Sequence, residues 1–222
     1  MVCQKSFSDK FGILVQGVGN WVSGSNTIFF IPKSQVPQDR TVAYVIIVCG
    51  IKPHKAKTHR TILNVAGNIT YWPGEVPTPT AYITTAKTLI NNTISTPDTR
   101  FVCADIANFY LNTPIYHYKY IQLTFDIIPQ DIIYEYNLTD ISHNGKVYIH
   151  IINGMYGLPQ SGIIAHDRFK NHPEKHGYQP VKLAPGICTQ KRITIYFTLI
   201  VDDFVINYVV KKHADHIIQA LQ

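Results

Sequence analysis

The stretch ITIYFTLIVDDFVINYVV, residues 193–210, decides the fold of this chain. Two runs of β-branched, aromatic and aliphatic residues flank a single acidic pair, Asp202 and Asp203. Apolar runs of this length, rich in Val, Ile, Phe and Tyr, favour β-strands, whereas aspartate is poor in strands and common in turns. The sequence therefore predicts a buried β-hairpin whose tip carries two adjacent carboxylates.

The rest of the chain mixes helical and strand patterns without strict alternation. We expect strands over residues 27–31, 41–49, 61–65, 100–104 and 147–152, and helices over 81–92, from Pro159 to about 176, and over 213–221. Loops are expected at 51–60 and 71–80, and a turn-rich insertion from Pro114 to about 145. This arrangement predicts an α+β fold with an antiparallel sheet packed on helices, rather than a doubly wound parallel sheet.

Two of the expected helices have an apolar face that would cover the sheet. Thr80 is the expected N-cap of the first, and its face consists of Ile83, Ala86, Ile90 and Ile94. In the last helix the corresponding residues are Ala214, Ile217, Ile218 and Leu221.

A third carboxylate, Asp105, follows the expected strand RFVCA directly. Buried carboxylates are costly and neighbouring ones repel each other, so a divalent cation is the simplest reason to keep them at strand ends. If the two strands are neighbours in one sheet, Asp105 converges with Asp202 and Asp203. Oxygen ligands of this kind suit Mg²⁺ or Mn²⁺, and two such ions serve nucleotidyl transfer. An acidic turn that faces solvent is the alternative.

The positive net charge of +6 is confined to the first quarter of the chain. Residues 1–60 hold eight basic and two acidic side chains, and the remainder holds equal numbers of each. A basic lobe beside a neutral one is typical of a protein that binds a polyanion such as nucleic acid. An ordinary solvated basic face is the alternative interpretation.

Cysteine usage and hydropathy indicate an intracellular protein. Because Cys3, Cys49, Cys103 and Cys188 lack paired spacing, neither a disulfide framework nor a zinc ribbon is expected. No apolar stretch approaches the roughly 18–20 residues of a membrane span, and charged residues interrupt the start of the chain, where a signal peptide would lie. We expect a cytoplasmic location, with the nucleus as the alternative, and no membrane partner.

Three motifs, taken in order, resemble the central motifs of a reverse transcriptase. They are FVCADIANFYLNTP at 101–114, GMYGLPQSG at 154–162 and LIVDDFVI at 199–206. Together with NTIFFIPKSQVPQDR at 26–40, they resemble the polyproteins of LTR retrotransposons of the copia type. The resemblance covers nearly the whole chain, and it rests on the order of the motifs because each alone is weak.

The resemblance implies a two-metal catalytic centre. Its catalytic carboxylates would be Asp105, Asp202 and Asp203. With the carbonyl oxygen of Ile106, they would bind two Mg²⁺ or Mn²⁺ ions.

The resemblance also implies three contacts to the incoming nucleotide. Tyr110 would be the aromatic gate against a ribose 2′-hydroxyl, Gln160 would pack beside the nucleotide, and Arg60 would contact the triphosphate. Tyr110 could equally be a core aromatic, and Gln160 a residue at a helix start. The family has a second basic residue two places after Arg60, where this sequence has Ile62, and Lys57 is the nearby substitute.

The fold implied is the fingers and partial palm of a right-hand polymerase. Fingers would span 1–78 and 113–163, and palm 79–112 and 164–222. The implied function is RNA-directed DNA synthesis from deoxynucleoside triphosphates on a primed RNA or DNA template. The primer 3′-hydroxyl attacks and pyrophosphate leaves, so positioning and charge neutralisation dominate the catalysis.

The sequence ends at Gln222, soon after the acidic hairpin. The family continues there with further palm strands, a thumb and a ribonuclease H domain. We therefore expect a polyprotein fragment with intact metal carboxylates, an incomplete palm and low or absent polymerase activity, which needs the missing domains for full activity. The alternatives are a catalytically inactive relic that only binds nucleic acid, and an RNA-directed RNA polymerase, against which Tyr110 argues.

Overall fold

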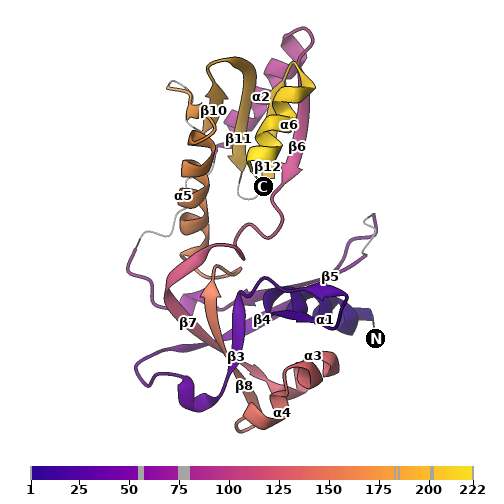
Figure 1. Ribbon diagram of the computed structural model, residues 1–222, viewed down its shortest axis with the longest axis vertical. Coiled ribbons are helices and arrows are strands. Elements are labelled where there is room, and N and C mark those ends of the chain that lie inside the picture. Colours follow the sequence, from indigo (N-terminus) through magenta and orange to yellow (C-terminus); the bar gives the residue numbers. More distant parts are fainter. Residues whose placement is uncertain are drawn as a thin grey trace. The chain divides into compact units, whose positions relative to one another are not determined.

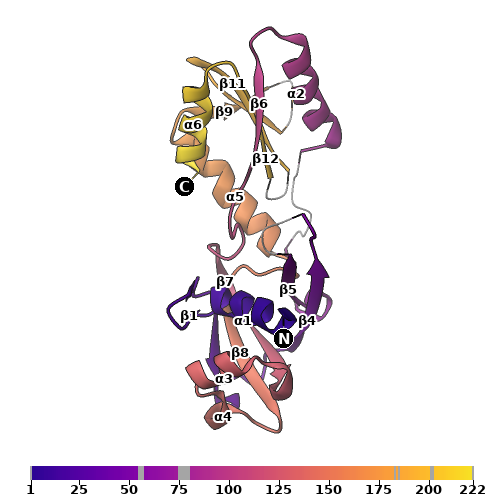
Figure 2. The ribbon, with the colours of Figure 1, turned by 90° about the vertical axis from the view of Figure 1, so that its right-hand side faces the viewer.

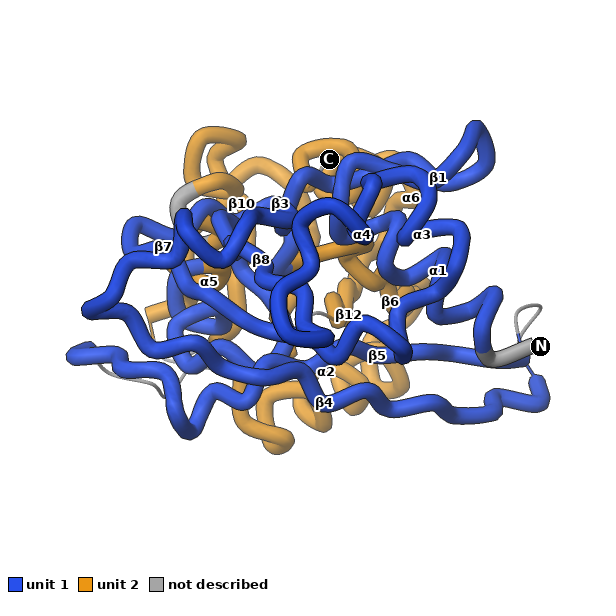
Figure 3. The backbone as a smooth tube through the Cα atoms, turned by 90° about the horizontal axis from the view of Figure 1, so that it is seen from below, with its two compact units in different colours: residues 1–76, 110–164 blue, residues 77–109, 165–222 orange. Residues whose placement is uncertain are grey.

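The structure, a computed structural model, divides into two compact units (Figure 3). It describes residues 2–54, 58–74, 81–182, 184, 186–200 and 203–221. Unit 1 comprises residues 1–76 and 110–164, and unit 2 comprises residues 77–109 and 165–222. Each unit has its own five-stranded sheet and apolar core. The chain is thus mixed α+β.

The unit boundaries lie near the boundaries expected from the sequence. The chain passes between the units at 76/77, 109/110 and 164/165, whereas the expected changes are at 78/79, 112/113 and 163/164. The assignment of these units to the fingers and palm of a polymerase stays a prediction.

Unit 1 contains a sheet with the strand order β3-β8-β7-β4-β5, a two-stranded ribbon and short helices (Figure 1). Its strands are β1 (Gly17–Val18), β2 (Val22–Ser23), β3 (Ile28–Ile31), β4 (Val42–Ile51), β5 (His59–Val65), β7 (Pro114–Thr124) and β8 (Lys146–Asn153). Its helices are α1 (Val2–Leu14), α3 (Gln130–Glu135) and α4 (Leu138–Ile141), with 3₁₀ turns at Lys33–Gln35, Gly67–Ile69 and Phe125–Ile127. The strand pairs are antiparallel except β4 with β7, which is parallel.

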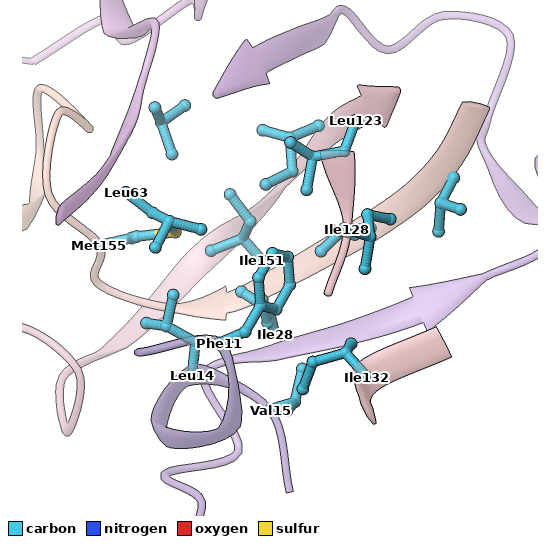
Figure 4. Close-up of a cluster of buried hydrophobic side chains, with 14 of the residues drawn as sticks. Phe11, Leu14, Val15, Ile28, Leu63, Leu123, Ile128, Ile132, Ile151 and Met155 are labelled. Carbon is cyan, nitrogen blue, oxygen red and sulfur yellow. The ribbon is translucent and has the colours of Figure 1, made fainter. Parts of the chain in front are cut away.

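One face of this sheet is buried against α1, α3 and α4. Phe7, Phe11 and Leu14 recur at helical spacing along α1, and none of the three is more than 8% exposed. They share one cluster with strand and helix residues that include Ile28, Leu63, Leu123, Ile132 and Ile151 (Figure 4). Complete burial of one such side chain contributes about 1.5–3 kcal/mol. This face therefore fixes where α1 lies against the sheet.

The expected turn-rich insertion instead contains the 11-residue strand β7. That prediction was wrong because Pro114 indicated a turn, although proline is accommodated at the first position of a strand. The residues that follow are rich in Tyr and Ile, which favour strands, and Ile121 and Leu123 are buried in the core. The expected loop over 51–60 is also shorter than predicted, because β4 and β5 extend into it from both sides.

Unit 2 contains an antiparallel sheet with the strand order β6-β12-β11-β10-β9. Its strands are β6 (Arg100–Asp105), β9 (Tyr178–Pro180), β10 (Ile187–Gln190), β11 (Ile193–Ile200) and β12 (Asp203–Tyr208). Its helices are α2 (Ile83–Ser95), α6 (Lys211–Ala220) and most of α5 (Ser161–Glu174), which begins within unit 1. The predicted hairpin is confirmed as β11 and β12, in which Ile200 pairs with Asp203.

Strand β12 is buried on both faces of this sheet (Figure 2). On one face Phe204 and Ile206 pack with Phe169 of α5 and Ile217 of α6. The predicted apolar face of α6 is confirmed, since its members are buried or partly buried in this cluster: Ala214, Ile217, Ile218 and Leu221.

On the other face β12 packs against α2. Val205 shares a small cluster with Leu89. The buried Asn207 donates hydrogen bonds from Nδ2 to the carbonyl oxygen of Leu89 (3.1 Å) and to Oγ1 of Thr93 (2.8 Å). Because a buried amide that lacks partners is costly, these bonds fix the register of α2 on the strand.

The predicted apolar face of α2 is wrong except at Ala86. The buried residues are Ala86 and Leu89, and three predicted members are exposed: Ile83, Ile90 and Ile94. The contacts that α2 makes with Val205 and Asn207 turn Ala86 and Leu89 towards the sheet. The spacing of apolar residues in the sequence does not distinguish this side of the helix from the predicted one. Thr80, the expected N-cap, lies outside the described residues.

In the part of the chain that the structure describes, no helix has the length and apolar character needed to cross a lipid bilayer.

Tyr178 of β9 has an ionisable hydroxyl that contacts His216 at the edge of the unit 2 core. Its buried hydroxyl lies 2.7 Å from Nδ1 of His216, at hydrogen-bond distance. Burial raises the pKa of Tyr178 to about 12. Since the ordinary pKa is about 10, the folded state holds this proton more tightly than the unfolded state. The contribution of Tyr178 to the free energy of unfolding is therefore fully present below about pH 10 and is lost as the pH rises towards 12.

We predict that Tyr178→Phe lowers the free energy of unfolding by about 1 kcal/mol at pH 8, because it removes the hydrogen bond. The difference between wild type and variant should shrink as the pH rises from 10 to 12. Urea unfolding across this range measures it. A difference that stays constant to pH 12 would contradict the assignment.

Candidate functional site

The structure brings two of the predicted metal ligands together. Strand β6 ends at Asp105, and the neighbouring strand β12 begins at Asp203. The two residues are direct antiparallel partners. Directly opposed residues share a face of the sheet, with Cβ atoms about 4.5–5.5 Å apart. Both are exposed.

The other predicted ligands are Asp202 and the carbonyl oxygen of Ile106. Asp202 lies outside the described residues. Ile106 follows Asp105 directly, and its half-buried side chain packs against the unit 2 core. This packing anchors the end of β6. Among the described residues no group of three or more His, Cys, Asp or Glu side chains is placed to hold a metal ion.

The donor chemistry of Asp105 and Asp203 nevertheless fits a hard cation. Like charges directly opposed across two strands are destabilising. No ion pair compensates either carboxylate within the residues that the structure describes. A divalent cation would remove the repulsion, and carboxylate oxygens are the ligands that Mg²⁺ and Mn²⁺ prefer.

The predicted nucleotide contacts all belong to unit 1. The half-buried ring of Tyr110 lies edge-on to the ring of Tyr156, with centroids 5.1 Å apart. The backbone is tight here, because a Cβ at Gly154 would lie 2.7 Å from the carbonyl oxygen of Tyr110. Only a glycine avoids this clash. Tyr110 is thus held at a defined position with part of its ring accessible.

Gln160 stands immediately before α5 and is completely buried. Neither its Nε2 nor its Oε1 has a hydrogen-bond partner among the described residues. An unpaired buried polar group costs about 1–3 kcal/mol, and such groups in native proteins call for an explanation. The segment that carries Gln160 has little freedom to expose it, because Gly157, at φ +88°, is pressed against the carbonyl oxygen of Val65.

Arg60 is an exposed residue of β5 and pairs with Gly50 of β4. The prediction placed it in a loop, whereas it lies near the start of the strand. Lys57 lies outside the described residues. Ile62, which stands where the resembling family has a second basic residue, is half-buried two places along the same strand.

Lys10 was not among the predicted site residues. Its ammonium group lies over the ring of Tyr156, 5.5 Å from the centroid. No local pattern links residues 10 and 156, since their approach depends on how α1 packs in the folded unit. The sequence therefore held no signal that could have found it.

Unit 2 also contains a cavity of about 480 Å³ that none of the predicted site residues lines. It lies between α5 and the sheet, and Phe169, Tyr178, Cys188 and Phe197 form part of its wall.

No protein-family model matches the chain, and a search of curated proteins finds no match.

If Asp105 and Asp203 repel each other as the register implies, Asp203→Asn should stabilise the protein without divalent ions. The expected gain is about 0.2–1 kcal/mol at low salt. Addition of Mg²⁺ should stabilise the wild type, because ligand binding favours the folded state, and should stabilise the variant less. Thermal unfolding with and without Mg²⁺ measures both effects.

Asp98→Asn is the matched control, since Asp98 is an exposed carboxylate of the same unit whose φ of 61° asparagine also tolerates. It should leave stability and the Mg²⁺ response unchanged. Equal Mg²⁺ stabilisation of wild type and Asp203→Asn would refute the site.

Proposed function

We propose that this chain is an RNA-directed DNA polymerase domain of the retrotransposon type, which adds deoxynucleotides to a primer 3′-hydroxyl with two divalent cations. The observation that carries the proposal is the register of β6 and β12, which sets Asp105 opposite Asp203. The two carboxylates repel each other at the ends of neighbouring strands. Binding of a divalent cation between them would remove this repulsion. The order of the three sequence motifs supports the same assignment.

In this proposal the carboxylates of unit 2 are the metal ligands, with Asp202 as the third. Metal ions bound there would stabilise charge on the attacking and leaving oxygens. The protein needs no nucleophile of its own, because the primer 3′-hydroxyl attacks. Its residues act by holding groups in position and by neutralising charge.

The residues of unit 1 would select and hold the incoming nucleotide. The partly accessible ring of Tyr110, fixed by Tyr156, would exclude a ribose 2′-hydroxyl by contact. The exposed guanidinium of Arg60 would neutralise triphosphate charge, since arginine stays protonated and suits phosphate geometry. Gln160 would pack beside the nucleotide, as the resemblance implies, although its side chain is completely buried in this structure.

A second candidate is a relic that binds nucleic acid without catalysis. Two observations favour it: Gln160 is completely buried, and Ile62 replaces the second basic residue of the resembling family. The basic excess in residues 1–60 would still attract nucleic acid.

The experiment that tests the proposal is single-nucleotide addition to a primed RNA template with Mg²⁺. We predict slow extension by the wild type. Asp105→Asn and Asp202→Asn should reduce the rate by about a thousandfold, because each removes several kcal/mol of charge stabilisation. Asp98→Asn should react like the wild type.

Binding of the same primed template separates the two candidates. If the wild type and Asp202→Asn are equally inert, yet both bind the duplex with an affinity that falls steeply with salt, the relic is correct. Extension that survives Asp105→Asn would contradict the metal ligands assigned here.

A further inference from the structure

The cavity of unit 2 is bounded by one side of α5 and by three neighbouring strands. His166, Phe169 and Pro173 line it from α5, and their spacing of three and four residues places them on one side of the helix. The small side chain of Cys188, at the centre of the facing row of strand residues, leaves a space of about 480 Å³ between helix and sheet. The row consists of direct cross-strand partners: Pro180 of β9, Cys188 of β10 and Phe197 of β11.

The cavity has a buried base and an exposed rim. Tyr178 and Phe197 in the base are buried, Phe169 in the wall is half-buried, and Tyr82 and Glu174 at the rim are exposed. A small molecule can therefore enter from the solvent and lose most of its contact with water in the base. Pockets of about 300–1,000 Å³ bind small molecules in this way.

Hydrogen bonds hold the rim of the cavity in place. The N–H of Ala81 donates to the carbonyl oxygen of Leu199 (3.4 Å), and the hydroxyl of Thr198 donates to the carbonyl oxygen of Gly186 (2.6 Å). Gly186 has a φ of +86°, and a Cβ at this position would lie 3.1 Å from the Cβ of Ala81. The rim is therefore tightly packed, and the cavity is formed before any ligand binds.

The aromatic rings around the base are held in edge-on contacts. The rings of Tyr178 and Phe197 lie 5.4 Å apart at 79°, and those of Phe169 and Phe204 lie 4.8 Å apart at 60°. Aromatic pairs in this geometry attract each other beyond the effect of the area that they bury. A planar aromatic ligand can extend this cluster in the same way, whereas an aliphatic ligand gains only from the burial of its surface.

The charges around the cavity favour a neutral ligand. No lysine or arginine lines it in the part of the chain that the structure describes, so an anion would enter an apolar base without a counter-ion, which is costly. A cation would meet Glu174 only at the exposed rim, where an ion pair contributes little. His166 and Gln179 place a few hydrogen-bonding groups in the half-buried wall.

We propose that this cavity is a binding site for an uncharged, planar aromatic small molecule that carries one or two hydrogen-bonding groups. Its rings pack between Phe169 on α5 and the strand residues Cys188 and Phe197, and its polar group lies at the half-buried wall. The inference goes beyond the proposed function and does not depend on it, because the cavity lies within unit 2 and neither Asp105 nor Asp203 lines it.

The test uses N-phenyl-1-naphthylamine, an uncharged aromatic amine whose fluorescence rises in apolar surroundings, titrated into the full chain. We expect saturable binding of one molecule per chain. Cys188→Phe should weaken binding about tenfold, because the added ring occupies the space that the ligand needs. Cys103→Phe is the matched control, since Cys103 is an exposed cysteine of the same sheet that does not line the cavity. It should bind like the wild type, and thermal unfolding checks that both variants fold.

Alkylation of the cysteines by N-ethylmaleimide gives a second measurement on the wild type, followed for each cysteine by peptide mass spectrometry. At ten times its Kd, the naphthylamine should slow alkylation of Cys188 about tenfold, because only unliganded protein reacts. The exposed Cys49 and Cys103 should react at unchanged rates. The negatively charged analogue 8-anilino-1-naphthalenesulfonate, at the same concentration, should protect Cys188 less.

Three results would overturn the inference. The first is a folded Cys188→Phe variant that binds the naphthylamine as tightly as the wild type. The second is equal weakening by Cys103→Phe, which would assign the ligand to the surface of the sheet. The third is equal protection of Cys188 by the sulfonate, which would contradict a neutral ligand. If Cys188→Phe does not fold, an alkylation rate of Cys188 that the naphthylamine leaves unchanged would contradict the site by itself.

Discussion

Strand β12 has to be buried on both faces at once, and the candidate site in unit 2 follows from that requirement. Phe204 and Ile206 fill the side of α5 and α6, while Val205 and Asn207 face α2. A slip of one residue would turn the phenylalanine towards α2 and the asparagine into the apolar cluster. The register is therefore strongly determined, and it places the first residue of β12, Asp203, opposite the last residue of β6, Asp105.

Packing of the unit 2 core thus compensates for the repulsion between the carboxylates of Asp105 and Asp203. A pair of opposed carboxylates is unfavourable by itself, but the cost is small beside the burial of two large side chains on the same strand.

Part of the fold and of the candidate site could be predicted from the sequence, because short continuous segments of the chain determine those elements. The acidic hairpin, the strand before Asp105 and the apolar face of α6 are continuous segments whose residue types favour one structure. The segment after Pro114 and the buried side of α2 were predicted wrongly. In the first, one proline outweighed a run of strand-forming residues. In the second, the contacts of Asn207 decided among apolar positions with similar spacing. The approach of Lys10 to Tyr156 depends on tertiary packing, which no local pattern encodes.

The most direct test of the central claim is the position of a bound cation relative to Asp105 and Asp203. Mn²⁺ broadens nearby NMR resonances, so titration of the isotopically labelled protein locates the ion from its backbone amides. We predict broadening centred on Asp105, Asp203 and their strand neighbours Ala104 and Phe204, and its loss in Asp105→Asn. Broadening centred elsewhere, or unchanged in that variant, would contradict the account.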